Sequence, residues 1–307
     1  MEKNVRALPL EGRWDIRKSR IKYLGPYEQR SDKIIPPPVG TLLFDKKLKR
    51  GTIRTKVRFE ENGSTIARII VGYDSESKSY YSVGIGGYNL AYLIDRFDRG
   101  VGWHAIVAEG DQRLIKTKKT YIIEARLEGQ RLILKIDNNE IFNIIVNPRT
   151  IGNQIGLFSW GSGNVVFRDI EIEVTKPRAF VIIKFDDVFA GIYEEIIVPI
   201  CSDMGLEPYK ADEVYKPGII MEDVTRGIAE SEIVIADITP VKNNENVYYE
   251  VGYAHALDKE VILLARRGFQ LPFDIAGYRV IFYDDISEKG KKQVENNLKK
   301  HLKSILK

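Results

Sequence analysis

The chain has 307 residues, more than one typical domain needs, and its 44% hydrophobic and 29% charged residues are typical of a soluble globular protein with an ample core. Residues 285–307 carry seven lysines and three acids, which equals the whole net charge of +4, so the neutral remainder argues against a broad nucleic-acid-binding face. A single cysteine, Cys201, excludes an internal disulfide, and no apolar segment is long enough for a signal peptide or a membrane span, so we expect a cytoplasmic protein without nucleic-acid or membrane partners.

The first half of the chain has the pattern of short β-strands separated by Gly, Asn and Asp turns, and no stretch before residue 180 has a helical period. Turns suited to hairpins occur at Gly129-Gln130 and Asn138-Asn139. The predicted strands are Thr52–Phe59, Thr65–Tyr73, Tyr80–Ile85, Leu90–Phe97, Tyr121–Leu127, Arg131–Ile136, Ile141–Val146, Gln154–Ser159 and Val165–Val174. Many short strands with tight turns predict an antiparallel β-sandwich over residues 1–176.

The last of these strands, Val165–Val174, alternates cleanly between two kinds of residue. We expect Val166, Arg168, Ile170, Ile172 and Val174 on one face of the strand. The opposite face then carries Val165, Phe167, Asp169, Glu171 and Glu173.

The pattern changes at Lys176-Pro177-Arg178, where the proline excludes a continued ladder strand. Apolar strands and helices alternate after it. The predicted strands are Ala179–Phe185, Leu206–Tyr209, Ile233–Ala236, Val261–Ala265 and Arg279–Tyr283, and the predicted helices are Ala190–Met204, interrupted by Pro199, Gly218–Ala229 and Val247–Leu257. This order predicts a flavodoxin-like α/β domain over residues 179–307, with a parallel sheet covered on both faces.

The carboxyl-terminal tail carries Val294, Leu298, Leu302 and Ile305 at helical spacing. This spacing predicts an amphipathic helix that packs on the domain and exposes its lysines to solvent. A site for an anionic partner is the alternative interpretation of the lysines.

Polar residues cluster where the parallel strands are predicted to end, which is where ligands bind to open parallel sheets. The first strand leads into Asp186, the second into Asp212, and the third ends in Asp237 and Thr239. Solvated acids are common in loops, so their shared location carries more weight than any one of them. We expect them to meet in one cleft.

Glu250 is the most informative residue of the set. Asn246 is a suitable N-cap, which would place Glu250 in the first helical turn, where the helix dipole favours an ionised carboxylate. The surrounding sequence VYYEVGYAHAL is too apolar for an ordinary exposed helix. A charged residue within it is expected to be paired or functional, and a glutamate that only stabilises the helix start is the alternative.

Three segments of the second half resemble one family. AFVIIKFDDVFAGIYEEIIVPI (Ala179–Ile200), YKADEVYKPGIIMEDVTRGIAES (Tyr209–Ser231) and SEIVIADITPVKNNENVYYEVGYAHALDKEVILLA (Ser231–Ala265) resemble the nucleoside 2-deoxyribosyltransferase-like superfamily. They also look related to bacterial Toll/interleukin-receptor-like (TIR-like) domains.

The resemblance implies hydrolysis or transfer at the N-glycosidic bond of a nucleoside, nucleotide or NAD-like substrate. Glu250 matches the glutamate that attacks the anomeric carbon, and Asp237 matches the aspartate that places this glutamate. The pocket would be lined by Phe185, Asp186, Asp212, Thr239 and Asn246. Adjacent carboxylates at positions 237 and 250 would raise one pKa of the pair, with a shared proton. We expect a homo-oligomer without metal or cofactor, in which NAD would be consumed as a substrate.

Two features depart from the deoxyribosyltransferase pattern. The loop Pro240–Asn246 lacks the family's usual acidic residues, and a fused β-domain is foreign to these small enzymes. The short Asn-rich loop is closer to the TIR-like branch, which is associated with nucleotide signalling and bacterial defence. The alternative function is a non-catalytic nucleotide-sensing receptor.

The first half resembles concanavalin-like (laminin G-like) sandwiches of jelly-roll type, on the basis of IGLFSWGSGNVVFRDIEIE (Ile155–Glu173). This resemblance implies a ligand-binding or oligomerisation module with a carbohydrate or protein ligand. Candidate sugar-binding side chains are Tyr88, Tyr92, Trp103, His104 and Trp160, although most aromatic residues of a sandwich belong to its core.

Overall fold

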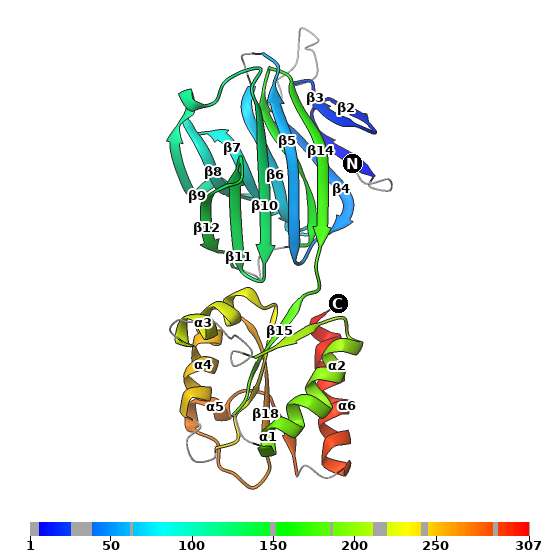
Figure 1. The fold of residues 1–307 in the computed structure, drawn as a ribbon, viewed down its shortest axis with the longest axis vertical. Helices are drawn as coiled ribbons and strands as arrows, with labels where there is room; N and C mark the ends of the chain where they lie inside the picture. Colours follow the sequence, from blue (N-terminus) through cyan, green and yellow to red (C-terminus); the bar gives the residue numbers. More distant parts are fainter. Residues whose placement is uncertain are drawn as a thin grey trace. The chain divides into compact units, whose positions relative to one another are not determined.

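The computed structural model describes residues 6–25, 39–61, 64–147, 152–184, 187–210, 220–240, 245–284 and 288–306. The chain forms two compact units, Met1–Thr175 and Lys176–Lys307. The first consists of two antiparallel sheets and the second of a parallel sheet with helices (Figure 1). This arrangement confirms the predicted fold class. Among the described helices, none combines the length and the apolar character needed to cross a bilayer.

The N-terminal unit is a β-sandwich of two seven-stranded sheets, with strand orders β1-β4-β13-β6-β7-β8-β9 and β12-β11-β10-β5-β14-β3-β2. Its strands are β1 (Ala7–Glu11), β2 (Trp14–Arg17), β3 (Arg20–Tyr23), β4 (Val39–Lys47), β5 (Gly51–Phe59), β6 (Ser64–Tyr73), β7 (Tyr80–Gly87), β8 (Leu90–Asp98), β9 (Gly102–Asp111), β10 (Thr120–Glu128), β11 (Arg131–Ile136), β12 (Asn139–Ile145), β13 (Gln154–Gly161) and β14 (Val165–Val174). A 3₁₀ turn, η1 (Gln112–Leu114), follows β9.

Five of these strands were not predicted from the sequence. Strands β1 to β3 have only four or five residues each, which is too few to identify a strand even where β3 alternates and buries Ile21 and Tyr23. Strand β9 is an exposed edge strand without a clear alternation. In β4 the alternation is lost for another reason. Leu42 and Phe44 enter the sandwich core, while Leu43 joins a separate apolar cluster of buried residues. Both faces of this strand are therefore apolar.

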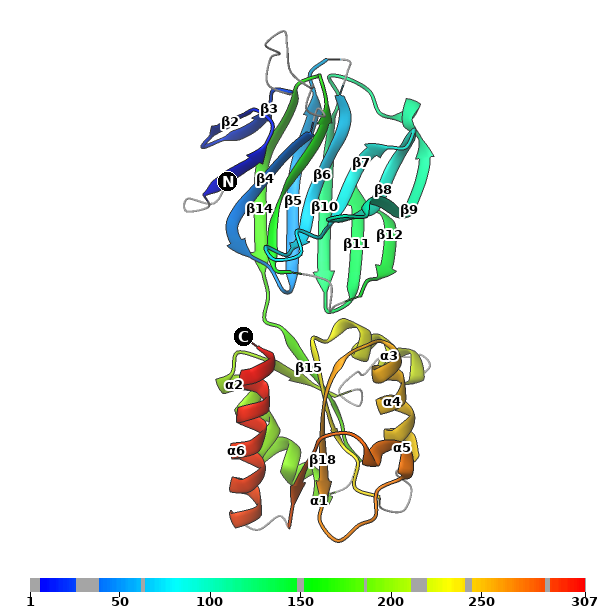
Figure 2. The same cartoon turned by 180° about the vertical axis from the view of Figure 1, so that it is seen from behind.

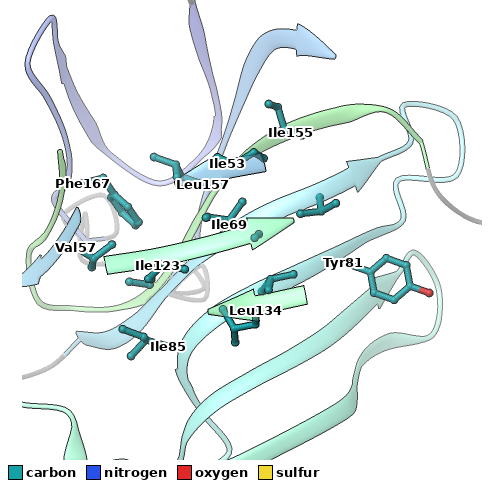
Figure 3. Close-up of a cluster of buried hydrophobic side chains, with 14 of the residues drawn as sticks. Ile53, Val57, Ile69, Tyr81, Ile85, Ile123, Leu134, Ile155, Leu157 and Phe167 are labelled. Carbon is teal, nitrogen blue, oxygen red and sulfur yellow. The ribbon is translucent and has the colours of Figure 1, made fainter. Parts of the chain in front are cut away.

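The space between the two sheets is filled by branched and aromatic side chains from nearly every strand. Figure 3 shows part of this core, in which Ile53 and Val57 of β5, Ile69 of β6, Ile123 of β10 and Phe167 of β14 are fully buried. Burial of apolar side chains of this size stabilises a fold by about 1.5–3 kcal/mol each. The core thus holds the two sheets together.

The alternation predicted for β14 is wrong beyond its midpoint. Val165 and Phe167 are in the core, but so are Ile170 and Ile172, which had been expected on the opposite face. The pairing of β14 with β5 shifts between Arg168 and Glu171, and Asp169 has a positive φ of 49°. This bulge inserts one residue and exchanges the two faces of the strand.

The C-terminal unit has a five-stranded parallel sheet with the order β16-β15-β17-β18-β19, which is the flavodoxin-like order. Its strands are β15 (Arg178–Ile182), β16 (Glu207–Tyr209), β17 (Ile233–Asp237), β18 (Glu260–Arg266) and β19 (Val280–Tyr283). Its helical segments are α1 (Asp187–Ile192), η3 (Tyr193–Ile197), α2 (Val198–Asp203), α3 (Ile220–Glu230), α4 (Glu245–Ala256), α5 (Phe273–Ala276) and α6 (Glu288–Ile305). Figure 2 shows α2 and α6 on one side of the sheet and α3 and α4 on the other.

Two buried clusters cover the faces of this sheet. One joins β17 and β18 to α2 and α6, and it includes the Val294, Leu298 and Leu302 stripe predicted for the tail helix. The other joins the same strands to α3 and α4. The predicted break at Pro199 does not occur, because Pro199 lies in the first turn of α2, where a missing N–H is tolerated, and the run is distorted instead by the π-helical turn η3 just before it.

Candidate active site

Asp237 ends β17 and lies almost completely inside the protein, with 2% of its surface exposed. Its Oδ1 accepts hydrogen bonds from the Thr239 backbone N–H (3.0 Å) and from the Thr239 hydroxyl (2.6 Å). Its Oδ2 accepts a hydrogen bond of 2.7 Å from the Tyr283 hydroxyl. Both oxygens of the carboxylate therefore accept hydrogen bonds from uncharged donors.

This cluster ties together the ends of three neighbouring strands. Thr239 follows β17, Tyr283 ends β19, and the Arg266 backbone N–H at the end of β18 donates to the Thr239 hydroxyl oxygen at 3.0 Å. Burial raises the pKa of Asp237, and the hydrogen bonds from Thr239 and Tyr283 oppose that rise. Burial also raises the pKa of Tyr283, so its phenol stays protonated and able to donate.

Glu250 lies in the second turn of α4 and is half-buried. Burial raises the pKa of its carboxyl group from 4.5 to about 7. Within the described part of the chain it forms no hydrogen bond or ion pair. A desolvated carboxylate without a neutralising partner is free to interact with positive charge that develops on a bound molecule.

The two carboxylates belong to opposite faces of the sheet. Ile233 and Ile235, which alternate in register with Asp237, pack in the cluster under α2 and α6. Val247 and Val251, which flank Glu250 on α4, pack in the cluster on the other face. Neither carboxylate is a cause of the other's pKa shift, so the raised pKa values arise from burial and not from the shared proton expected for an adjacent pair.

The hydroxyl of Tyr248 connects α4 to the end of β17. It donates a hydrogen bond of 2.7 Å to the backbone oxygen of Ile238, the residue after Asp237. Burial, and then the charge of Asp237, raise the pKa of Tyr248. The helix that carries Glu250 is thus fixed to the strand end that carries Asp237.

The other predicted site residues have different positions. Thr239 is fully buried and bonded to Asp237. Asn246 is exposed and lies inside α4, which begins at Glu245, so its prediction as the N-cap was wrong, and Glu250 is in the second turn and not the first. Phe185, Asp186 and Asp212 lie outside the described residues.

Sequence reasoning did not identify three groups of the site, namely Tyr283, Tyr248 and the backbone N–H of Arg266. Tyr283 and Arg266 each end a parallel strand, so the strand-end rule that selected Asp237 would also have found them. Tyr248 carried no comparable signal. The described residues contain no group of three or more His, Cys, Asp or Glu side chains placed to hold a metal ion.

The five aromatic candidates of the sandwich are not equivalent. Trp103 and Trp160 both line two neighbouring hollows, and the exposed Tyr88 lines one of them. Tyr92 instead packs against the sandwich core. His104 is partly exposed, with its Nε2 3.6 Å from a carboxylate oxygen of Asp98.

No protein-family model matches this sequence, and no curated protein matches it. Similar solved structures include a carbohydrate-binding module from Bacillus subtilis, with 16% identity over 54% of this chain and 94% of that chain and a TM-score of 0.43. Porphyranase B from Zobellia galactanivorans has 8% identity over 56% and 87% of the two chains, with a TM-score of 0.38. A 2-deoxyribosyltransferase from Bacillus psychrosaccharolyticus has 14% identity over 40% and 90%, with a TM-score of 0.32. At such low identities and TM-scores, these similarities carry no argument about function.

Proposed function

We propose that the α/β unit cleaves the N-glycosidic bond of a nucleoside, nucleotide or NAD-like substrate, by hydrolysis or by transfer. The observation that carries this proposal is the Glu250 carboxyl, which is desolvated, lacks a described partner and has a pKa of about 7. It is supported by the flavodoxin-like strand order, in which ligands bind beyond the carboxyl ends of the strands.

In the proposed reaction the ionised Glu250 faces the anomeric carbon of the sugar. As the bond from this carbon to the base nitrogen breaks, the base leaves with the electron pair and takes up a proton, and positive charge develops on the sugar. The carboxylate stabilises that charge or forms a bond to the carbon, which a water or an acceptor hydroxyl then displaces. The low solvation of Glu250 strengthens this electrostatic effect.

Asp237 acts in this scheme as a positioning residue. Its oxygens are occupied by Thr239 and Tyr283, and its burial leaves little surface for a substrate. Through Ile238 and Tyr248 it fixes the start of α4 relative to the strand ends. Thr239 has the same supporting role, while Phe185, Asp186, Asp212 and Asn246 remain our candidates for the lining of the pocket.

The test is to incubate the whole protein with a panel of nucleosides, nucleotides and NAD and to measure free base by chromatography. We expect base release by the wild type, and its loss by several orders of magnitude in Glu250→Gln, because a neutral amide neither attacks nor stabilises the developing charge. Glu245→Gln, an exposed glutamate on the same helix, is the matched control and should retain activity.

Two outcomes would contradict the proposal. One is a Glu250→Gln variant with wild-type activity. The other is a wild type that binds a nucleotide of the panel but releases no base, which would favour a nucleotide-sensing receptor.

A further inference from the structure

The outer face of the sheet β1-β4-β13-β6-β7-β8-β9 carries a second apolar cluster, separate from the sandwich core. Leu43, Ile70, Tyr73, Tyr80 and Phe158 are buried there, and Phe97, Trp103 and Trp160 are partly buried around them. The outer face of an antiparallel sheet is ordinarily polar where solvent covers it. An aromatic surface in this position indicates a binding function.

The rings of this cluster contact one another across five strands. The ring centroids of Tyr73 and Tyr80 are 5.7 Å apart, those of Tyr80 and Trp103 5.6 Å, and those of Trp103 and Phe158 4.9 Å. Phe97 lies 5.1 Å from Trp103. These ring contacts hold the partly exposed Trp103 in a fixed orientation.

Two hollows adjoin on this surface, with volumes of about 310 and 500 Å³. Trp103 and Trp160 line both, so the two hollows lie side by side, and together they are called the groove below. Sites of this size, with aromatic walls and a few polar groups, are typical of small-molecule binding.

The smaller hollow has a charged but neutralised floor. Arg68 and Asp95 are both buried there and form an ion pair. The Arg68 Nε also donates to the backbone oxygen of Gly86 at 3.0 Å, and its guanidinium lies over the Phe158 ring at 5.8 Å from the centroid. These contacts make the floor rigid and leave it without net charge.

The larger hollow has an excess of positive charge at its edge. Lys78 and Arg99 line it and form no ion pair within the described part of the chain. Glu11 is the acid on the same lining, and its Oε2 accepts a hydrogen bond of 2.9 Å from the Thr41 hydroxyl. Two cations against one acid favour a ligand that carries negative charge.

We propose that this groove binds an acidic oligosaccharide. The apolar C–H faces of successive sugar rings would stack on Trp103 and Trp160, because a sugar ring presents an apolar face and a hydroxylated edge that match an aromatic surface with a polar rim. Hydroxyl groups would hydrogen-bond Glu11 and Thr41, and a carboxylate or sulfate group would pair with Arg99 and Lys78. This binding site is independent of the reaction proposed for the α/β unit.

An array of uronate-containing, sulfated and sialylated oligosaccharides, each printed beside its neutral counterpart, tests the proposal on the whole protein. We expect binding to at least one acidic member, with at least tenfold weaker binding to its neutral counterpart. The affinity for that pair is then measured by the change in tryptophan fluorescence, since two of the three tryptophans of the chain lie in the groove.

Three variants identify the site. Trp160→Ala should weaken binding at least tenfold, and Arg99→Gln should remove the preference for the acidic member while retaining binding to the neutral one. Arg131→Gln, on β11 of the other sheet, is the control and should bind as the wild type. Circular dichroism confirms that each variant is folded. Absence of binding to the whole array, equal binding of acidic and neutral members, or an unaffected Trp160→Ala variant would each overturn the proposal.

Discussion

Ionisation of Glu250 should destabilise the folded protein at neutral and alkaline pH. Its pKa is about 7 in the fold, against 4.5 for an unperturbed glutamate, because burial disfavours the charged form. Below pH 4.5 the carboxyl is protonated in both the folded and the unfolded states, and no free energy is lost. Between pH 4.5 and 7 the folded state binds the extra proton, so stability falls as pH rises, and above 7 the full penalty applies.

The size of this penalty follows from the two pKa values. Each unit of pKa corresponds to about 1.4 kcal/mol, so the rise from 4.5 to about 7 gives about 3.5 kcal/mol as an upper limit. Solvent reaches part of the side chain and lowers the value, so we expect about 1–3 kcal/mol. Glu250→Gln removes the charge and should recover this free energy at pH 8.5 but very little at pH 4.5.

The assay is the melting midpoint of the wild type and of Glu250→Gln across pH 4.5–8.5, by scanning calorimetry. The variant should be more stable by several degrees at pH 8.5, and the difference should shrink as pH falls through 7. Glu245→Gln, at an exposed position of α4, should show no such pH-dependent gain. If Glu250→Gln is no more stable than the wild type at pH 8.5, the carboxyl is solvated and our description of the site is wrong.

Three further predictions concern the framework of the two units. Tyr283→Phe leaves Oδ2 of Asp237 without its donor and should cost about 1–3 kcal/mol in chemical denaturation; an unchanged midpoint would show that the hydrogen bond contributes nothing. Arg68→Met leaves the Asp95 charge buried without its partner and should cost about 3–5 kcal/mol, so a variant as stable as the wild type would argue against this pair. Residues 1–175 and 176–307, expressed separately, should each melt cooperatively, and unfolded fragments would refute the proposed division into independent domains.

The local pattern of apolar and polar residues was sufficient to predict much of the architecture. In the second unit, apolar strands alternate with helices, and most of these elements can be identified from a window of about ten residues, although the four-residue helix α5 was not predicted. The strand-end rule then selected Asp237, and the apolar sequence around Glu250 indicated that its carboxylate is unusual. Nine strands of the sandwich were also predicted, because each alternates or is bounded by turn residues.

Features that depend on contacts distant in the sequence were decided by the tertiary structure. The bulge at Asp169 exchanges the faces of β14, and its position follows from pairing with β5 and not from the alternation of β14 itself. Asp237 is bonded to Tyr283, a partner 46 residues away that only the parallel order of β17, β18 and β19 brings near. The aromatic groove depends likewise on strand order, because its rings come from strands that become neighbours only in the sheet. They lie on the face of that sheet that does not pack in the sandwich core. Composition gives the number of aromatic residues, but only the packing of the strands decides which of them, such as Trp103 and Trp160, line a surface open to a ligand.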